Sequence, residues 1–334
     1  MNKTQIISNN VLERLNNLCK KTEVLTMNYY SSVKELIGNT PLVKISHYAI
    51  PQGVNVFAKL EYFNPGGSVK DRLGQKLIRT AIEGGLLPEN GTVIEPTAGN
   101  TGIGLALAAI GTKIKIICVI PQKFSIEKQN LMKALGAEVI NSPTEEGMEG
   151  AIKKAEELLM KIPDSYSPQQ FSNENNPKTY YETLGPEIYE ALQGKIDIFA
   201  AGAGTGGTFM GCARYLKEKN PKIKTVIVEP EGSILNGGKA GPHRTEGIGM
   251  EFLPPFMETG LFDAIHTISD KDAFKRVKEL ALLQGYLVGS SSGAAFEAVL
   301  KEAESAPPGT NIVTIFPDSS ERYLSKSIYE EDIQ

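Results

Sequence analysis

Cysteine is scarce in this sequence of 334 residues, where only Cys19, Cys118 and Cys212 occur. None of them is spaced as a metal clip or as a Cys-x-x-Cys redox pair, so the sequence predicts no metal site and no dithiol chemistry. An odd and sparse set of thiols is typical of the reducing cytoplasm, which is the location we expect. Cys118 lies in the apolar run 116–120 and is predicted to be a buried core residue.

Basic blocks and long apolar runs are also missing. The formal net charge is -4, which argues against a nucleic-acid partner. No apolar run is long enough to span a membrane. Residues 1–26 lack the apolar core of a signal peptide, and their two glutamates and single arginine argue against a mitochondrial transit peptide. We therefore expect residues 1–30 to be an N-terminal extension, either one short amphipathic helix or a mobile tail, with Met27 as a candidate second start.

Alternating strand-like and helix-like segments follow. A hydrophobic content of 41% with 22% charged residues predicts a packed core, and the length predicts two domains or one two-lobed unit. The alternation predicts an α/β fold of mostly parallel sheets with helices on both faces, and ligands bind such sheets at the carboxyl ends of strands. The predicted strands are 54–60, 92–95, 113–120, 138–141, 196–201, 225–229 and 311–316. The predicted helices are 70–83, 102–110, 125–135, 149–160, 178–192, 208–219, 270–284 and 293–305.

One lysine lies in a telling segment, residues 64–72, which read NPGGSVKDR. Pro65 is expected to end the preceding strand, because proline cannot extend a sheet interior. Ser68 and Asp71 have capping-box spacing and predict a helix start near Ser68. Lys70 then lies in the first turn, where the helix dipole favours a neutral amine that can form a Schiff base with an aldehyde. The alternative is a solvated surface lysine.

A second cluster, residues 95–104, reads EPTAGNTGIG and leads from a strand into a helix. Its backbone N–H groups and hydroxyls could hold a carboxylate or a phosphate. The alternative is a glycine-rich turn that only lets a helix pack closely on a strand.

A third cluster, residues 202–208, reads GAGTGGT and also lies between a predicted strand and helix. Its small residues predict a cup for a phosphate, with hydroxyl donors from Thr205 and Thr208. Its glycines also match the dinucleotide pattern G-x-G-x-x-G, and Glu229 ends the next strand at a suitable distance. An NAD-dependent oxidoreductase is therefore an open alternative, although it gives Lys70 no role.

The fourth cluster, residues 288–293, reads VGSSSG and precedes a helix. Its serines could cap that helix, or one hydroxyl could contact a ligand atom. We expect all four clusters to lie at strand-to-helix junctions. Together they predict an aldehyde ligand with a phosphate, held by a lysine, and pyridoxal 5′-phosphate (PLP) has these features. The sequence has three histidines, none of them in a glycine-rich cluster, so a histidine base is poorly supported.

Four ordered motifs, at 64–72, 95–104, 202–208 and 290–293, resemble the cysteine synthase/cystathionine β-synthase family of PLP enzymes. The similarity runs from about Ser32 to Tyr323 and includes LIGNTPL at 36–42. The resemblance implies the two-domain fold of the tryptophan synthase β-like group (fold type II) and a homodimer. It also implies a smaller mobile domain at 64–174 and a larger phosphate-binding domain at 31–63 plus 175–334.

The resemblance also assigns roles by position. It makes Lys70 the Schiff-base lysine and general base, Asn100 the partner of the phenolic oxygen on the ring, and Ser291 the partner of the ring nitrogen. A neutral hydroxyl there makes a weak electron sink, which suits loss of a leaving group from Cβ followed by addition of a thiol. The phosphate is assigned to Gly204, Thr205, Gly206, Gly207 and Thr208. The substrate carboxylate is assigned to Thr97, Gly99, Thr101 and Gln170, and part of the closing pocket wall to Gly247, Ile248 and Gly249.

Two positions indicate which thiol reacts. Position 98 is alanine, where cysteine synthases usually have serine, and Glu246 stands where many sulfide-using relatives have glutamine. Together with EPEGS at 229–233, they resemble the bacterial O-acetylserine-dependent cystathionine β-synthases. Ala98 would enlarge the pocket, and Glu246 could attract the ammonium of homocysteine. We therefore expect homocysteine to replace the acetyl group of O-acetylserine, in transsulfuration. The alternatives are sulfide, as in cysteine biosynthesis, and a dehydratase that needs no thiol.

Overall fold

The computed structural model describes residues 29–330 except 47, 98 and 123. Residues Leu36–Gln334 form one compact unit and Met1–Glu35 another. In the N-terminal unit, the N–H of Ser31 donates to the Glu35 carboxylate. Most of the predicted N-terminal extension, with its amphipathic helix and Met27, lies outside the described residues. The sections below concern the larger unit.

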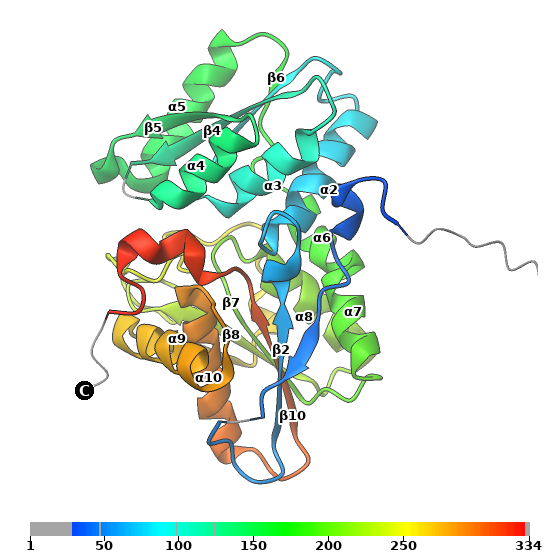
Figure 1. Ribbon diagram of the computed structural model, residues 1–334, viewed down its shortest axis with the longest axis vertical. Coiled ribbons are helices and arrows are strands. Elements are labelled where there is room, and N and C mark those ends of the chain that lie inside the picture. The colour runs from blue at the N-terminus through cyan, green and yellow to red at the C-terminus, as the bar shows by residue number, and fades with distance from the viewer. Residues whose placement is uncertain (1–28, 47, 98, 123, 331–334) are drawn as a thin grey trace, which may run out of the picture. The chain divides into compact units, whose positions relative to one another are not determined.

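A six-stranded sheet has the order β1-β2-β10-β7-β8-β9 (Figure 1). Only β1 runs antiparallel, to β2, and the other neighbours pair in parallel. The strands are β1 (Leu42–Lys44), β2 (Asn55–Leu60), β7 (Ile198–Gly202), β8 (Lys224–Pro230), β9 (Ala264–Ile268) and β10 (Asn311–Phe316).

Helices bury both faces of this sheet. Phe199 of β7 packs in one core cluster with Phe209 of α8 (Gly207–Lys219). Its neighbour Ala200 packs in another cluster with Phe296 of α10 (Ser290–Ser305). Because successive strand residues point to opposite faces, a strand covered on both sides must be apolar throughout. This explains the unbroken apolar run in β7. Helix α9 (Asp270–Gln284) packs beside α10.

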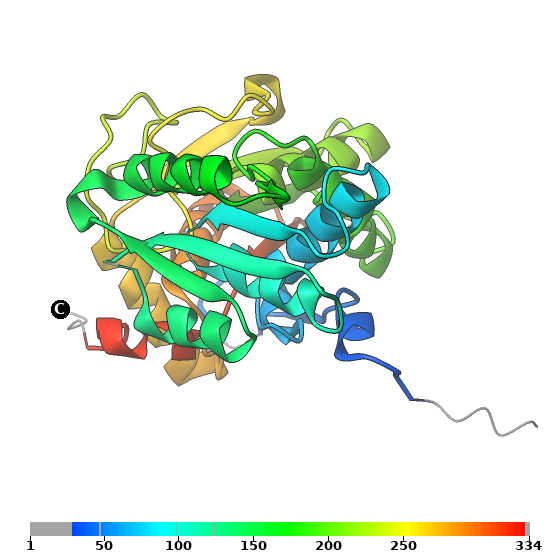
Figure 2. The same ribbon diagram turned by 90° about the horizontal axis from the view of Figure 1, so that it is seen from above.

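A four-stranded parallel sheet has the order β5-β4-β3-β6 (Figures 1 and 2). On one face, Val119 packs with Ala151 of α5. On the other, Cys118 is fully buried in the same cluster as Ile103 of α3, which confirms its predicted core position. The elements are β3 (Thr92–Pro96), α3 (Asn100–Ala109), β4 (Lys115–Pro121), α4 (Ile126–Ala134), β5 (Glu138–Ser142), α5 (Gly147–Lys161) and β6 (Ser165–Tyr166). This sheet lies within 64–174, although the predicted domain boundaries and mobility stay predictions.

Two glycines set the contact between α3 and α2 (Lys70–Glu83). A Cβ atom added to Gly74 would lie 2.2 Å from the carbonyl carbon of Gly104. One added to Gly104 would lie 2.4 Å from the carbonyl oxygen of Lys70. The two helices therefore touch backbone to backbone, which places the start of α2 beside α3.

Three features differ from the expected elements. The helix expected at 178–192 is two helices, α6 (Asn175–Glu182) and α7 (Leu184–Ala191), separated at Thr183. Pro186 explains the break, because proline lacks the N–H that a continuous helix needs but is tolerated in a first turn. Helix α10 begins at Ser290 instead of residue 293. The short strands β1, β6 and β9 had no predicted counterpart.

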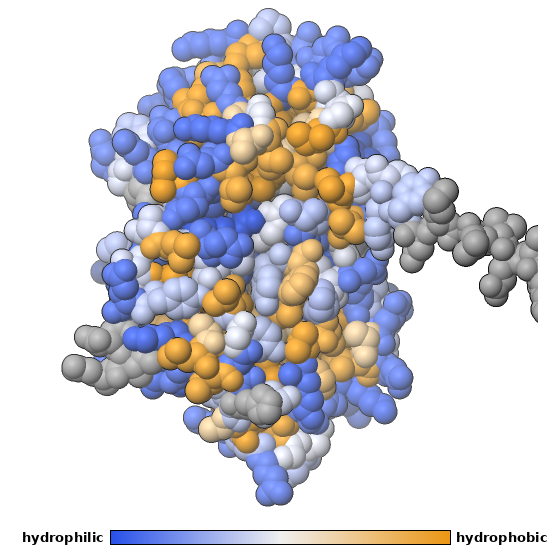
Figure 3. Space-filling model, in the orientation of Figure 1, coloured by the Kyte–Doolittle hydropathy of each residue, from blue (hydrophilic) through white to orange (hydrophobic). Residues whose placement is uncertain are grey.

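The described part of the chain contains no helix with the length and apolarity needed to cross a lipid bilayer. On the face shown in Figure 3, hydrophobic residues gather over the side of the four-stranded sheet. The exposed hydrophobic side chains of α4 include Ile126 and Leu131. Elsewhere on this face, hydrophilic and hydrophobic residues alternate in small groups.

Candidate active site

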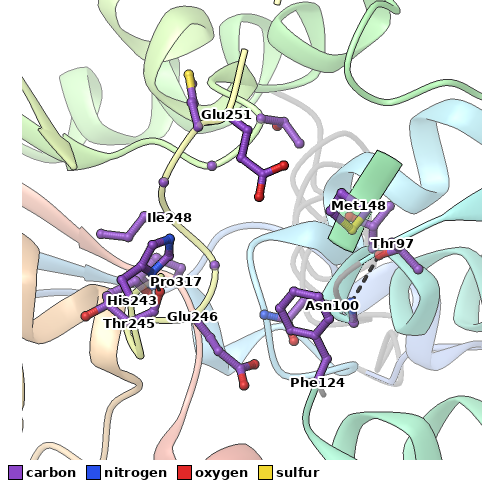
Figure 4. Close-up of a pocket in the computed structure, with 18 of the residues that line it drawn as sticks. Thr97, Asn100, Phe124, Met148, His243, Thr245, Glu246, Ile248, Glu251 and Pro317 are labelled. Atoms are coloured by element: carbon purple, nitrogen blue, oxygen red, sulfur yellow. Dashed lines mark hydrogen bonds between the residues drawn. The ribbon is translucent and has the colours of Figure 1, made fainter. Parts of the chain in front are cut away.

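A cavity of about 380 Å³ is lined by residues that follow strands of both sheets. The loop after β3 contributes Thr97, the loop after β7 contributes Thr205, and Asp318 follows β10. Figure 4 shows Glu246 and Glu251, which come from one loop, opposite Asn100, Phe124 and Thr97. The cavity therefore lies where α/β sheets bind ligands, at the carboxyl ends of strands.

Lys70, the first residue of α2, borders this cavity. Lys70 is half-buried, and its Nζ atom lies 5.8 Å from the centre of the Tyr180 ring. Among the described residues, no carboxylate pairs with this amine. Burial lowers the pKa of Lys70 to about 8, which makes the neutral amine accessible near neutral pH. Burial thus adds a second physical reason for a neutral amine at this position.

The segment before Lys70 differs from its prediction in two details. Strand β2 already ends at Leu60 and a 3₁₀ turn, Glu61–Phe63, follows it, so Pro65 does not end the strand. The capping box is also wrong, because the Ser68 hydroxyl accepts from the N–H of Lys70 and not from that of Asp71. The Asp71 carboxylate instead accepts from the N–H of Gly66, at 2.5 Å. The Gly66-Gly67 turn folds the chain back far enough to make this contact.

The loop before α3 bonds mainly to itself and to Gln170. The Thr97 hydroxyl accepts from the N–H of Gly99, at 3.1 Å, and the Thr101 hydroxyl donates to the Gln170 side chain, at 2.7 Å. The Gln170 amide donates in turn to the Pro96 carbonyl. This leaves the first-turn N–H groups of α3, which no carbonyl of that helix satisfies, as donors for an anion. Ala98 lies outside the described residues.

The predicted phosphate cup reaches the cavity only in part. Gly204 and Thr205 border it, whereas residues 206–208 lead into α8 and are not among its lining. A Cβ atom on Gly204 would lie 2.4 Å from the carbonyl oxygen of Gly247, so only glycine allows the two loops to approach so closely. The Thr205 hydroxyl accepts from the Asn176 amide, at 3.0 Å, and retains its own O–H donor.

Ser291 also borders the cavity. Its hydroxyl borders the cavity and has no hydrogen-bond partner among the described residues. Gly247 has φ +89°, and a Cβ atom there would find only the Ser291 Oγ within 4 Å, at 3.9 Å. The expectation that every cluster follows a strand is wrong here, because this cluster lies between α9 and α10. None of its serines caps α10, whose N-cap is Gly289.

Glu229, the residue that made a dinucleotide site conceivable, is fully buried. Its carboxylate accepts from the N–H groups of Leu235 and Asn236 and from the Thr267 hydroxyl. A ribose would have to displace these bonds. In the described part of the chain, no group of three or more histidine, cysteine or acidic residues could hold a metal ion.

A chain of polar side chains that the motifs did not predict runs along the cavity. Glu246 pairs with the Nζ atom of Lys128, at 3.1 Å, and this amine also donates to the Tyr323 hydroxyl, at 2.9 Å. The Tyr323 hydroxyl donates to Asp318, which also accepts from Asn100. Glu246 and Asn100 were predicted to belong to the site. The other three residues were not: Lys128 comes from α4, Asp318 from the segment after β10 and Tyr323 from a C-terminal 3₁₀ helix (Ser320–Lys326). No glycine-rich signal marks these three, so sequence reasoning missed them.

The Lys70 amine, the glycine-rich loop at Gly204 and the Ser291 hydroxyl border one cavity, and together they suit an aldehyde ligand with an anionic tail. They define an enzyme that uses such a cofactor. The chain belongs to the family of pyridoxal-phosphate-dependent enzymes, whose family model matches residues 33–318. PLP is therefore its cofactor, and the fold is fold type II of these enzymes. Lys70 would hold the aldehyde carbon, and the cavity that it borders together with Gly204, Gly247 and Ser291 would hold the ring.

Several characterised proteins are similar to this chain. The O-acetylserine dependent cystathionine beta-synthase of Bacillus subtilis is 58% identical over 92% of this chain and all of that protein. A cysteine synthase of Helicobacter pylori is 56% identical over 90% of this chain and 98% of that protein. The crystal structure of the O-acetylserine dependent cystathionine beta-synthase from Helicobacter pylori has a TM-score of 0.88, with 56% identity over 91% of this chain and all of the other.

Proposed function

We propose that the protein catalyses β-replacement on O-acetylserine, in which homocysteine displaces acetate and gives cystathionine. The observation that carries the proposal is the Lys70 amine, which borders the cavity, has a pKa lowered to about 8 by burial and has no carboxylate partner among the described residues. The proposal for the substrates is supported by the names of the most similar relatives, which use O-acetylserine for cystathionine or are called cysteine synthases. Membership of the PLP family favours this function over an NAD-dependent oxidoreductase.

Lys70 carries the proton transfers. When bound, PLP withdraws electrons from the α-carbon of an amino acid joined to it. The neutral amine of Lys70, with a pKa of about 8, takes the proton from that α-carbon as general base. Acetate then leaves Cβ with the electrons of the broken C–O bond. The thiol gives up its proton to water, its sulfur forms the new bond to Cβ, and Lys70 returns to Cα the proton that it took.

The other residues bind and orient. We assign the phenolic oxygen of the cofactor to Asn100, the ring nitrogen to Ser291 and the phosphate to residues 204–208. Ser291 is a neutral partner, so it leaves the ring nitrogen with little positive charge, which suits loss of a group from Cβ. The substrate carboxylate is assigned to Thr97, Gly99, Thr101 and Gln170, with the first-turn N–H groups of α3 as its main donors.

The choice of thiol rests on the acidic residues at the cavity. Lys128 already neutralises Glu246, so the predicted attraction of Glu246 for the ammonium of homocysteine is weaker than the sequence indicated. Glu251 borders the same cavity, is exposed, and has no ion pair among the described residues. We therefore propose that Glu251 adds to this attraction. Sulfide lacks an ammonium and would not benefit from either carboxylate.

The experiment compares kcat/KM for homocysteine and for sulfide, each with O-acetylserine, and identifies cystathionine or cysteine as product. We expect homocysteine to be preferred. Glu251→Gln should raise the KM for homocysteine about fivefold or more and leave that for sulfide unchanged, since one exposed charge contributes about 1 kcal/mol. A preference for sulfide would make the protein a cysteine synthase, and ammonia release without any thiol would make it a dehydratase.

We also propose a homodimer in the cytoplasm, acting in transsulfuration, with residues 64–174 as the mobile domain. Sedimentation equilibrium tests the dimer, since a monomer at micromolar concentration would contradict it.

A further inference from the structure

Asp318 follows the last strand of the six-stranded sheet and meets three of the four predicted clusters. Its backbone forms a β-bridge with Ser68, two residues before the lysine. Its carbonyl accepts from the N–H of Gly289, at 3.1 Å, at the start of α10. Its carboxylate accepts from the Asn100 amide, at 2.6 Å. Asp318 is 1% exposed, so these contacts form in the protein interior at the edge of the cavity.

The carboxylate of Asp318 has little freedom to turn. A Cβ atom on Gly289 would lie 2.2 Å from its Oδ1 atom and 2.7 Å from the Tyr323 ring, so both groups pack against the bare glycine. The Oδ2 atom accepts from Asn100 and from the Tyr323 hydroxyl. Burial, followed by the charge of Asp318, raises the pKa of Tyr323 well above 10, so this hydroxyl keeps its proton and donates.

Asn100 is held at both ends of its amide. Its nitrogen donates to Asp318, and its oxygen accepts from the Arg322 guanidinium, at 3.1 Å. A flipped amide would place its oxygen against the carboxylate and its nitrogen against the guanidinium, so both contacts would become repulsive. An amide nitrogen carries two N–H donors, and Asp318 uses one. The second has no partner among the described residues, and Asn100 borders the cavity.

We propose that Asp318 and Arg322 are positioning residues, which fix the Asn100 amide so that its second N–H points to the bound cofactor. The inference rests on the proposed function for the role of Asn100. Arg322 also donates to the Gly66 carbonyl, so the same guanidinium links this amide to the turn before Lys70. The groups assigned to the aldehyde and to the neighbouring phenolic oxygen of the cofactor are thereby linked to each other.

A double-mutant cycle on the PLP-loaded enzyme tests the proposal. We expect Asn100→Ala and Asp318→Ala each to shift the visible absorption band of the lysine-bound cofactor and to lower kcat about 10–100-fold, the usual effect of losing a group that orients a ligand-binding residue. If Asp318 acts through Asn100, the double variant should differ less than twofold from the more impaired single variant. Losses that multiply, or an unshifted band in Asp318→Ala, would overturn the proposal.

If Asp318→Ala does not fold, a second variant still allows the double-mutant cycle to be measured. Asp318→Asn keeps the shape and one acceptor but not the charge, and the same cycle applies to it. Asp263→Asn is the matched control, because Asp263 accepts hydrogen bonds from Thr225 and Lys217 away from the cavity. The visible absorption band of the cofactor in this variant should match that of the wild type. The band reports on the cofactor without any substrate. An enzyme that fails to convert O-acetylserine would therefore overturn the proposed function and leave the spectral cycle to decide on Asp318.

Discussion

Lys70 and Arg72 are two cations in the first turn of one helix, and their surroundings are opposite. The Arg72 guanidinium is 4% exposed and bonds two carboxylates, those of Glu61 at 2.8 Å and Glu187 at 2.6 Å. Burial alone would lower the pKa of Arg72, but these partners outweigh it and raise the pKa. Lys70 has burial without partners, and its pKa falls to about 8. The same helix thus carries one cation paired with two carboxylates and one amine that has no carboxylate partner among the described residues.

Removing the Lys70 amine should have the largest effect on activity. We expect Lys70→Ala to lose the visible band of the bound cofactor and at least about 10³-fold in kcat/KM, because the amine is both covalent partner and general base. Borohydride reduction and peptide mapping should find the cofactor on Lys70 in the wild type and on no other residue. Lys76→Ala, on the same helix and paired with Glu182, should keep band and activity. A coloured and active Lys70→Ala would contradict the assignment.

Arg72 should respond in the reverse way. Arg72→Met leaves Glu61, which is fully buried, without its main partner, so we expect the free energy of unfolding to fall by about 3–5 kcal/mol. Urea unfolding of the cofactor-free protein measures this loss. A variant as stable as the wild type would show that the two cations do not differ as described.

Lys70→Met tests the same comparison at Lys70, where we expect stability to rise while activity is lost. It keeps most of the side-chain volume and removes an ammonium that burial disfavours, so the cofactor-free protein should gain about 1–3 kcal/mol of unfolding free energy while activity is lost. Urea unfolding at pH 7 is the measurement. A destabilised Lys70→Met would indicate that the amine has a stabilising contact in the folded protein.

The smallest effect should be the pH dependence of the stability that Glu187 contributes. Burial raises the pKa of its carboxyl, but the bonds from Arg72 outweigh burial and lower the pKa to about 2. A lowered pKa in the folded state stabilises above the unfolded value, near 4.5, and this stability is lost as the pH falls towards 2. We expect Glu187→Gln to cost about 2–3 kcal/mol at pH 7, and this difference from the wild type should shrink by about 1 kcal/mol at pH 3.5. A difference independent of pH would contradict this.

The fold could be predicted where local pattern and tertiary context agree. The predicted segments 70–83, 270–284 and 311–316 match α2, α9 and β10 residue for residue, because their apolar periodicity is clear and strong breakers flank them. Strand β9 was missed because its residues are half-buried at the edge of the sheet, which weakens the apolar signal. The strands β1 and β6 are too short for any period to show.

Residues of the site could be predicted from the sequence only where they lie in a glycine-rich segment. Lys70, Asn100 and Ser291 stand in such segments, and they do border one cavity. Lys128 and Asp318 do not, and only the packing of distant segments brings them to the same place. A lysine in a helix or an aspartate after a strand is common in any sequence, so nothing local distinguishes these two from surface residues.

The crossing of α2 and α3 at Gly74 and Gly104 has a consequence for precision. At these two crossing points no side chain stands between the helix that begins with the lysine and the helix that begins with the asparagine, so no rotamer change there can alter the gap. The span between those two ends is therefore as stiff as the peptide backbone itself. Repacking of the surrounding core would leave it unchanged, whereas one methyl group at either crossing point would force the helices apart.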